Sequence, residues 1–188
     1  MPRLHVISAS TRPTSAGRPL AAWIAELAAG REEFDTTLID LGEVNLPFFD
    51  EPEHPSEGRY IHRHTKEWSA TVAAADCFVF VMPMYNGGFT APLKNAIDYL
   101  QKEWQGKPVG LISYSAGSSG GAPAVEMIQP VLRRVGLRSA RRSLSIPGIE
   151  ERLAGRYGNF VATAELAAQA AAVLDEVALL AAAERTAV

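Results

Sequence analysis

The sequence predicts a single α/β domain over residues 1–188, with helices on both faces of a five-stranded parallel sheet. Two observations carry this prediction: short, almost uninterrupted apolar runs, and amphipathic helical segments that alternate with them. Apolar runs without polar alternation are typical of strands that are buried on both faces, as in parallel sheets. Repeated alternation of strand and helix then makes a doubly wound, three-layer sandwich the expected architecture.

Five runs are the expected strands. Three are strongly apolar, and the last is only weakly apolar. The second mixes apolar with polar side chains, which is typical of a strand at the edge of a sheet. A doubly wound sheet of this size takes the flavodoxin-like order 2-1-3-4-5, and it binds ligands at the carboxyl ends of strands 1 and 3, near strand 4. The expected strands cover residues 4–8, 34–40, 77–82, 109–113 and 139–145.

Five helices are expected between and after these strands. The third should begin after Thr90, a favoured N-cap residue, with Pro92 in its first turn. The second is expected over residues 60–75. The apolar positions that define the helices are Leu20, Ile24 and Leu27 for the first, Trp68 and Val72 for the second, Leu93, Ile97 and Leu100 for the third, Val125, Ile128, Leu132 and Val135 for the fourth, and Leu166, Val173, Val177 and Leu180 for the last.

Composition and charge argue against several classes of protein. Hydrophobic residues make up 47% of the chain, which is enough for a real core, and the net charge of −3 provides no electrostatic basis for binding nucleic acid. The single cysteine, Cys77, forms no intramolecular disulfide and fits a reducing compartment. Since no leader pattern and no uninterrupted apolar run of about 18 residues is present, we expect a cytoplasmic protein without a membrane partner.

The loop after the first strand offers donors for an anion. Its polar side chains are Ser10, Thr11, Arg12, Thr14 and Ser15. Together with the N–H groups of the following helix, these hydroxyls and the guanidinium form the donor set that a phosphate dianion needs. A capped, solvated turn would explain the serines and threonines as well. Neither a P-loop nor a Gly-x-Gly-x-x-Gly pattern is present.

The loop after the third strand suits a flat ligand. Pro83 fixes the exit from the strand, and Gly87, with the glycine after it, allows close backbone approach. Met84 and Tyr85 can pack on an aromatic ring, and Asn86 can bond ring heteroatoms. The alternative is an ordinary turn with an aromatic residue packed inward. The position at the switch point favours a ligand.

The loop after the fourth strand, residues 113–121, consists of small residues that leave backbone amides open to a ligand. A flexible turn without a ligand is the alternative. The segment also resembles the nucleophile elbow of a serine hydrolase, with Ser115 as nucleophile. That fold needs a histidine after the serine, and all four histidines precede Ser115. A hydrolase is therefore not expected.

These motifs resemble the NADPH-dependent FMN reductase family of flavodoxin-like proteins, which includes FMN, quinone, azo-dye and chromate reductases. The resemblance is carried by Ser-Thr-Arg-Pro at residues 10–13 with Gly17, by Pro-x-Tyr-Asn at residues 83–86, and by Pro-Leu-Lys-Asn-Ala-Ile-Asp at residues 92–98. It extends from the first strand through the fourth. One departure is Ala9, where family members usually have glycine, so that a methyl group is expected to crowd the turn.

The resemblance implies a set of FMN-binding residues. Ser10, Arg12 and Ser15 would bind the phosphate with Gly17 near the turn, Pro83, Met84, Tyr85, Asn86 and Gly87 would line the isoalloxazine ring, and Ser115 and Gly117 would approach its pyrimidine end. It also implies NAD(P)H as electron donor, a small acceptor such as free flavin, a quinone, an azo dye or a metal oxyanion, and a homodimer or homotetramer. The helix with Lys94, Asn95 and Asp98 helps form the dimer in this family.

No catalytic side chain and no metal site is expected. Hydride transfer from a nicotinamide to a flavin requires proximity and stacking, and no protein acid or base is obligatory. On a helix, the rings of His62 and His64 would point about 200° apart and would not converge on a metal. A non-enzymatic, flavodoxin-like electron carrier remains the alternative function, although a net charge of −3 is mild for that class.

Overall fold

The computed structural model, which describes residues 1–155 and 158–186, is organised around one parallel sheet in the order β2-β1-β3-β4-β5. All four neighbouring strand pairs are parallel. The flavodoxin-like order predicted from the sequence is confirmed, and each predicted strand lies within one residue of its observed ends. The strands are β1 (Arg3–Ser8), β2 (Asp35–Asp40), β3 (Cys77–Pro83), β4 (Pro108–Tyr114) and β5 (Arg138–Ile146).

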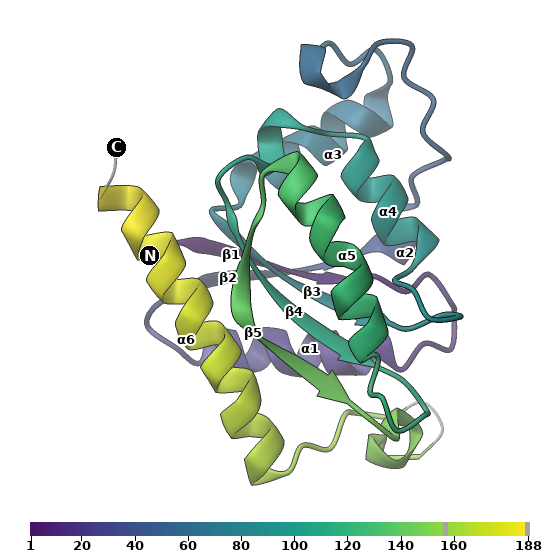
Figure 1. Ribbon diagram of the computed structural model, residues 1–188, viewed down its shortest axis with the longest axis vertical. Coiled ribbons are helices and arrows are strands. Elements are labelled where there is room, and N and C mark those ends of the chain that lie inside the picture. Colours follow the sequence, from purple (N-terminus) through teal and green to yellow (C-terminus); the bar gives the residue numbers. More distant parts are fainter. Residues whose placement is uncertain (156–157, 187–188) are drawn as a thin grey trace.

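Helices cover both faces of the sheet and make three layers (Figure 1). One face carries α1 (Gly17–Ala29) and α6 (Ala164–Thr186), and the other carries α3 (Arg63–Ala74), α4 (Ala91–Asp98) and α5 (Ala122–Val135). Thr90 caps α4 as predicted, because its Oγ1 accepts the Leu93 N–H at 3.3 Å. Short helical turns not predicted from the sequence are α2 (Leu41–Val44), η1 (Pro55–Glu57), η2 (Lys102–Trp104) and η3 (Ile149–Arg152).

The central strand β3 is buried along its whole length and divides the core in two. Val79 and Val81 pack toward α1 and α6, whereas Phe78 and Phe80 pack toward α3, α4 and α5. Strict burial on both faces explains why its sequence is a continuous apolar run. Cys77 at its start is fully buried, and burial raises the pKa of its thiol to about 12, so the thiol is a core group.

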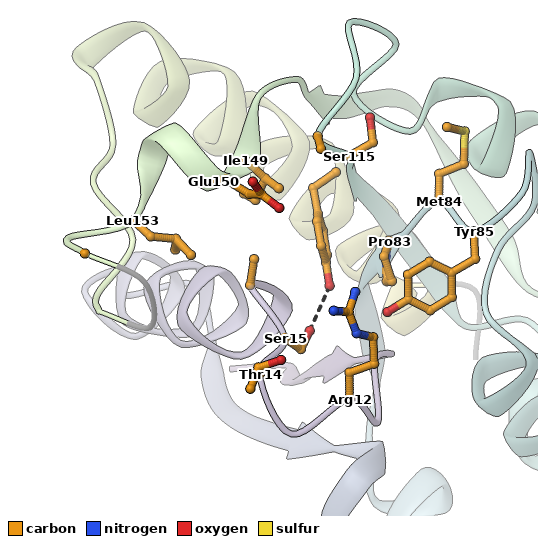
Figure 2. A pocket seen from close by; sticks show the side chains of 14 residues that line it. Arg12, Thr14, Ser15, Pro83, Met84, Tyr85, Ser115, Ile149, Glu150 and Leu153 are labelled. Carbon is orange, nitrogen blue, oxygen red and sulfur yellow. Dashed lines mark hydrogen bonds between the residues drawn. The ribbon is translucent and has the colours of Figure 1, made fainter.

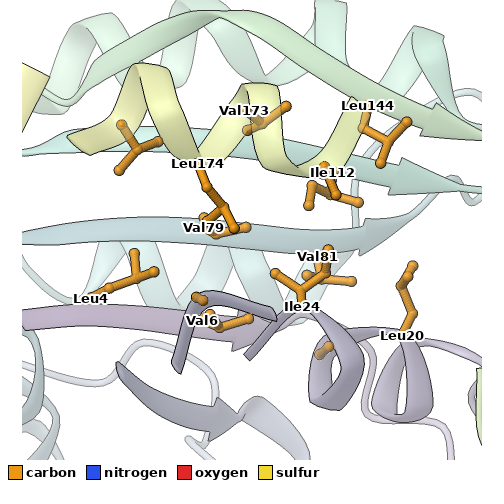
Figure 3. Packing of buried hydrophobic residues seen from close by; sticks show 14 of the residues in the cluster. Leu4, Val6, Leu20, Ile24, Val79, Val81, Ile112, Leu144, Val173 and Leu174 are labelled. Carbon is orange, nitrogen blue, oxygen red and sulfur yellow. The ribbon is translucent and has the colours of Figure 1, made fainter. Parts of the chain in front are cut away.

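The long helix α6 lies across β4 and β5. By length and composition residues 164–183 could also cross a membrane, which is weak evidence on its own. In this structure Val173 and Leu174 pack against the sheet, as Figure 3 shows. Gly110 on β4 makes this close approach possible, since a Cβ there would lie 2.8 Å from Val173 Cγ1. Packing in the core therefore accounts for the apolar residues of α6.

Helix α3 begins later than predicted, at Arg63 instead of residue 60. His62 is its N-cap with an extended backbone, and the Glu51 carboxylate accepts the N–H groups of Ile61 and His62 at 2.8 and 3.0 Å. The expected divergence of the two histidines is therefore wrong: their rings stack 5.2 Å apart, because His62 is not helical. Among the described residues, no group of three metal-ligating side chains is placed to hold a metal ion.

The segment between α2 and α3 is held against α4. Asn95 Nδ2 donates to the Pro47 carbonyl at 2.7 Å, and its Oδ1 accepts the Phe49 N–H at 3.0 Å. The Tyr99 hydroxyl lies 3.0 Å from Asp50 Oδ1. Asn95, one of the residues that carry the family resemblance, thus orders its own chain in this structure. The expected homodimer or homotetramer and the cytoplasmic location stay predictions.

We expect Gly110→Ala to lower the free energy of unfolding by about 1–3 kcal/mol, because its Cβ would push α6 away from the sheet. The loss should shrink in a Val173→Ala background, where the nearest colliding atom is gone and the contact with Val177 Cγ2 at 3.0 Å stays. Gly30→Ala is the control, since a Cβ there meets its nearest neighbour at an ordinary 3.6 Å. Denaturant titration followed by tryptophan fluorescence measures the wild type and these variants, and an equal loss in both backgrounds would contradict the packing account.

Candidate functional site

A cavity of about 670 Å³ opens at the carboxyl edge of the sheet, where the loops after β1, β3 and β4 meet the turn after β5. Figure 2 shows side chains from all four segments facing it. The strand order reverses between β1 and β3, and sheets of this type bind ligands at the carboxyl ends of those strands. The described lining residues are Arg12, Thr14, Ser15, Ala16, Pro83, Met84, Tyr85, Tyr114, Ser115, Ala116, Ile149, Glu150, Leu153 and Gly155.

Six of the eleven predicted site residues line this cavity, and five do not. The six are Arg12, Ser15, Pro83, Met84, Tyr85 and Ser115. The other five are not among the lining residues; they are Ser10, Gly17, Asn86, Gly87 and Gly117.

The loop after β1 presents its donors at one end of the cavity. Arg12 is exposed there, and Ser15 Oγ accepts the N–H of Gly17, the first residue of α1, at 3.0 Å. The N-cap of α1 is Ala16, which has no side chain able to cap the helix, so the bond to Gly17 comes from Ser15. Ser10 is buried, and its Oγ lies 3.0 Å from the Tyr85 hydroxyl. A guanidinium and hydroxyl groups beside the start of a helix together suit an anion.

Ala9 fits the turn without crowding it. The residue is fully buried and is not in the left-handed backbone region that would call for glycine. Its N–H donates to the Val81 carbonyl at 2.9 Å, and its carbonyl accepts the Thr90 hydroxyl at 2.7 Å. The expected crowding by this methyl group is therefore wrong, because the backbone here is one that any residue adopts and the methyl group joins the core.

The loop after β3 is a miniature hairpin. Tyr85 and Gly88 exchange backbone hydrogen bonds of 2.9 and 3.0 Å across a turn whose central residues are Asn86 (φ 51°) and Gly87 (φ 86°). Positive φ at both central positions defines a type I′ turn, for which Asn-Gly is the favoured pair. Asn86 and Gly87 thus lie at the tip of the turn, outside the lining, and their conformation holds Tyr85 at the wall.

The loop after β4 contributes Ser115 to the wall. Its N–H donates to the Ile146 carbonyl at 3.2 Å, and its hydroxyl donates to the Gly117 carbonyl at 3.0 Å. No histidine lies among the described residues that line the cavity. Gly117 stands in open space, with nothing within 4 Å of a Cβ built on it.

Tyr114 is the most informative residue that the sequence did not single out. It is the last residue of β4, its side chain is buried, and its hydroxyl lies 3.1 Å from Ser15 Oγ, the contact dashed in Figure 2. Burial raises the pKa of its hydroxyl to about 12, so the group keeps its proton at neutral pH. A Cβ on Gly17 would lie 2.3 Å from this hydroxyl, which explains the glycine at position 17.

The turn after β5 was also missed. Ile149, Glu150 and Leu153 close the side of the cavity opposite Tyr85, and Glu150 is the acidic side chain among the described lining residues. The available signal was positional, because β5 runs parallel to β4 and ends at the same edge.

Comparison with known proteins yields a consistent set of relatives. The model of the family described as NADPH-dependent FMN reductase matches residues 2–151. An NAD(P)H-dependent FMN reductase of Schizosaccharomyces pombe is 39% identical over 141 residues, which cover 74% of this chain and 70% of the relative. A quinone reductase of Pseudomonas putida KT2440 is 32% identical, covering 68% of this chain and 67% of that protein.

Solved structures agree on the fold. The flavoenzyme NAD(P)H:(acceptor) oxidoreductase FerB from Paracoccus denitrificans superposes with a TM-score of 0.75 at 22% identity, over 94% of this chain and 97% of that one. A flavodoxin from Pseudomonas aeruginosa superposes with a TM-score of 0.55 at 17% identity, over 95% and 97%.

We expect Gly17→Ala to lower the free energy of unfolding by about 1–3 kcal/mol, since the new methyl group collides with the Tyr114 hydroxyl. Adding Tyr114→Phe removes the colliding oxygen and should recover part of this loss. Urea denaturation of the single and double variants measures the difference. If Gly17→Ala proved as stable as the wild type, the close contact between the two loops would be wrong.

Proposed function

Because this chain belongs to the NADPH-dependent FMN reductase family, we propose that it binds FMN in this cavity. Through the bound FMN it would pass electrons from NAD(P)H to a small acceptor. The chain is an oxidoreductase of the NAD(P)H-dependent FMN and quinone reductase type. The observation that supports the proposed site most strongly is the convergence of three predicted loops on one cavity, with anion donors at one end and an apolar and aromatic wall beside them.

The residues present fit FMN. Arg12, Thr14 and Ser15 would hold the phosphate beside the N-terminus of α1. Gly17 supports this interpretation, since a side chain there would collide with the Tyr114 hydroxyl and disturb the phosphate end of the cavity. When bound, the flavin supplies the hydride and electron chemistry, and the chain supplies binding and orientation.

The wall residues would place the ring. Pro83, Met84 and Tyr85 line the cavity together, and the Met84 N–H donates to the Tyr114 carbonyl at 3.1 Å, which fixes this wall to β4. A proline ring, a thioether and a phenol ring are apolar surfaces suited to an aromatic ligand. Ser115 would face the ring from the β4 side.

No lining side chain is needed as an acid or base for hydride transfer. The titratable groups among the described lining residues are Arg12, Tyr85, Tyr114 and Glu150. Tyr114 keeps its proton because burial raises its pKa, and Glu150 is exposed. The role of the chain is therefore to orient the ligand and to exclude water from one of its faces.

The acceptor is proposed as a small molecule, such as free flavin, a quinone, an azo dye or a metal oxyanion. Support comes from the relatives, which carry the names quinone reductase and NADPH azoreductase. The alternative of a non-enzymatic electron carrier has weaker support. The flavodoxin superposes at 17% identity, a level that shows the fold alone, whereas reductases match in sequence over two thirds of the chain.

We expect the purified protein to show flavin absorption in the visible after FMN is added, and to oxidise NADPH or NADH when FMN and a quinone are supplied. Both follow from a flavin that is reduced by nicotinamide at the cavity and reoxidised by the acceptor. Absorbance titration and nicotinamide absorbance are the measurements. FMN binding without nicotinamide consumption would indicate the electron carrier instead, and no binding at micromolar FMN would remove the proposal.

Arg12→Ala should weaken FMN binding by about 1.5–3 kcal/mol, the range of a charge-assisted hydrogen bond. Riboflavin, which lacks the phosphate, should bind both proteins equally well. The matched control is Arg63→Ala, because Arg63 is exposed and pairs with Glu67 at 2.6 Å on α3. Quenching of flavin fluorescence gives the dissociation constants, and unchanged FMN affinity would place Arg12 outside the phosphate site.

A further inference from the structure

Two serine–tyrosine pairs join the loop after β1 to the neighbouring strands. The Ser10 and Tyr85 hydroxyls lie 3.0 Å apart, and the Ser15 and Tyr114 hydroxyls lie 3.1 Å apart. Each serine oxygen also accepts one backbone N–H, from the residue two positions later in the chain. Ser10 accepts from Arg12, and Ser15 accepts from Gly17. The second pair belongs to the cavity wall, since Ser15 and Tyr114 both line it.

The hydrogen-bonding capacity of Ser15 fixes what this pair can do. A serine hydroxyl has one proton and two lone pairs. The N–H of Gly17 takes one lone pair at 3.0 Å. If the Tyr114 hydroxyl donates to the second lone pair, the Ser15 proton is not used in this contact. It is then available to an anion in the cavity. If Ser15 instead donated to Tyr114, that proton would be lost to the ligand.

Burial decides the direction of this bond. Tyr114 is 5% exposed, so its side chain is largely shielded from water, and a partner in the protein best satisfies its hydroxyl proton. Ser15 Oγ, 3.1 Å away, is its stronger hydrogen-bonding neighbour, and Ser10 is a weaker one. The hydroxyl stays protonated at neutral pH, since burial raises its pKa to about 12. Close packing against Gly17 leaves no room for a side chain that could displace it.

We propose that Tyr114 is a positioning residue that donates to Ser15 and thereby turns the Ser15 proton toward the phosphate of the ligand. This inference rests on the proposed function, because it takes the phosphate to be that of FMN. The contact acts on the phosphate end of the cavity. Tyr114 therefore contributes to selecting FMN over riboflavin, whose ribityl chain ends in a hydroxyl and offers no dianion to the turned proton.

The pair formed by Ser10 and Tyr85 differs in a way that assigns the role to Tyr114. Ser10 is buried and does not line the cavity, so its proton is not aimed at the ligand space. The backbone bond from Arg12 to Ser10 is long at 3.5 Å, whereas the bond from Gly17 to Ser15 is 3.0 Å. The Ser10 pair ties the loop to the hairpin after β3, and the Ser15 pair presents a donor.

Tyr114→Phe tests the proposal, because it removes the hydroxyl and keeps the ring. Apoprotein is titrated with FMN and with riboflavin, and the dissociation constants are read from quenching of flavin fluorescence. The variant should bind FMN about 3–10-fold more weakly, the effect of losing one hydrogen bond between neutral groups, and should bind riboflavin with unchanged affinity. Tyr60→Phe is the control, since the Tyr60 hydroxyl bonds Glu103 at 3.1 Å, outside the cavity lining.

A double-mutant cycle shows whether the effect passes through Ser15. Ser15→Ala should weaken FMN binding at least as much as Tyr114→Phe, and adding Tyr114→Phe to it should cause no further loss. Additive losses would overturn the proposal, as would an equal loss of FMN and riboflavin affinity, which indicates ring packing alone. Unchanged FMN affinity in Tyr114→Phe would overturn it and leave the proposed function standing. A wild type that binds no FMN would remove both.

Discussion

Burial of β3 on both faces is the constraint on which the rest of this structure depends. A strand with no solvent-exposed face must have neighbours on both sides and helices above and below it. β1 and β4 pair with it in parallel, and parallel pairing forces each connection to cross over through a helix. Every strand therefore ends at the same edge of the sheet, and the loops that carry polar side chains are brought together there.

Hydrogen bonds between these loops turn a shared edge into a defined cavity. Tyr85 and Tyr114 come from the ends of neighbouring strands and reach back to Ser10 and Ser15 of the first loop. The Asn-Gly turn after Tyr85 has the backbone geometry that a two-residue hairpin requires, so Tyr85 is held in place by local chemistry. Orientation of side chains before a ligand arrives is the contribution that the protein makes to flavin chemistry.

Local capping explains where the sequence-based expectations failed. Helix α3 was expected from residue 60, but the Glu51 carboxylate binds the N–H groups just before it and holds His62 in an extended conformation. Because His62 lies outside the helix, its ring takes a different orientation and stacks on the ring of His64. Helical periodicity could not reveal this, since Glu51 is remote in sequence and its contact arises only on folding.

The sequence by itself determined the strand order, the edge that carries the site and six residues of the cavity wall, because buried periodicity and the switch-point rule depend on local patterns alone. Only the tertiary structure showed that Tyr114 and the turn after β5 belong to the wall. Tyr114 and Glu150 carry no motif, and they join the site because β4 and β5 end beside β1 and β3 in space. Gly17 was predicted to lie near a turn, but the reason for a glycine at this position is the close contact with Tyr114. Such contacts join residues far apart along the chain, and no local pattern of residues encodes them.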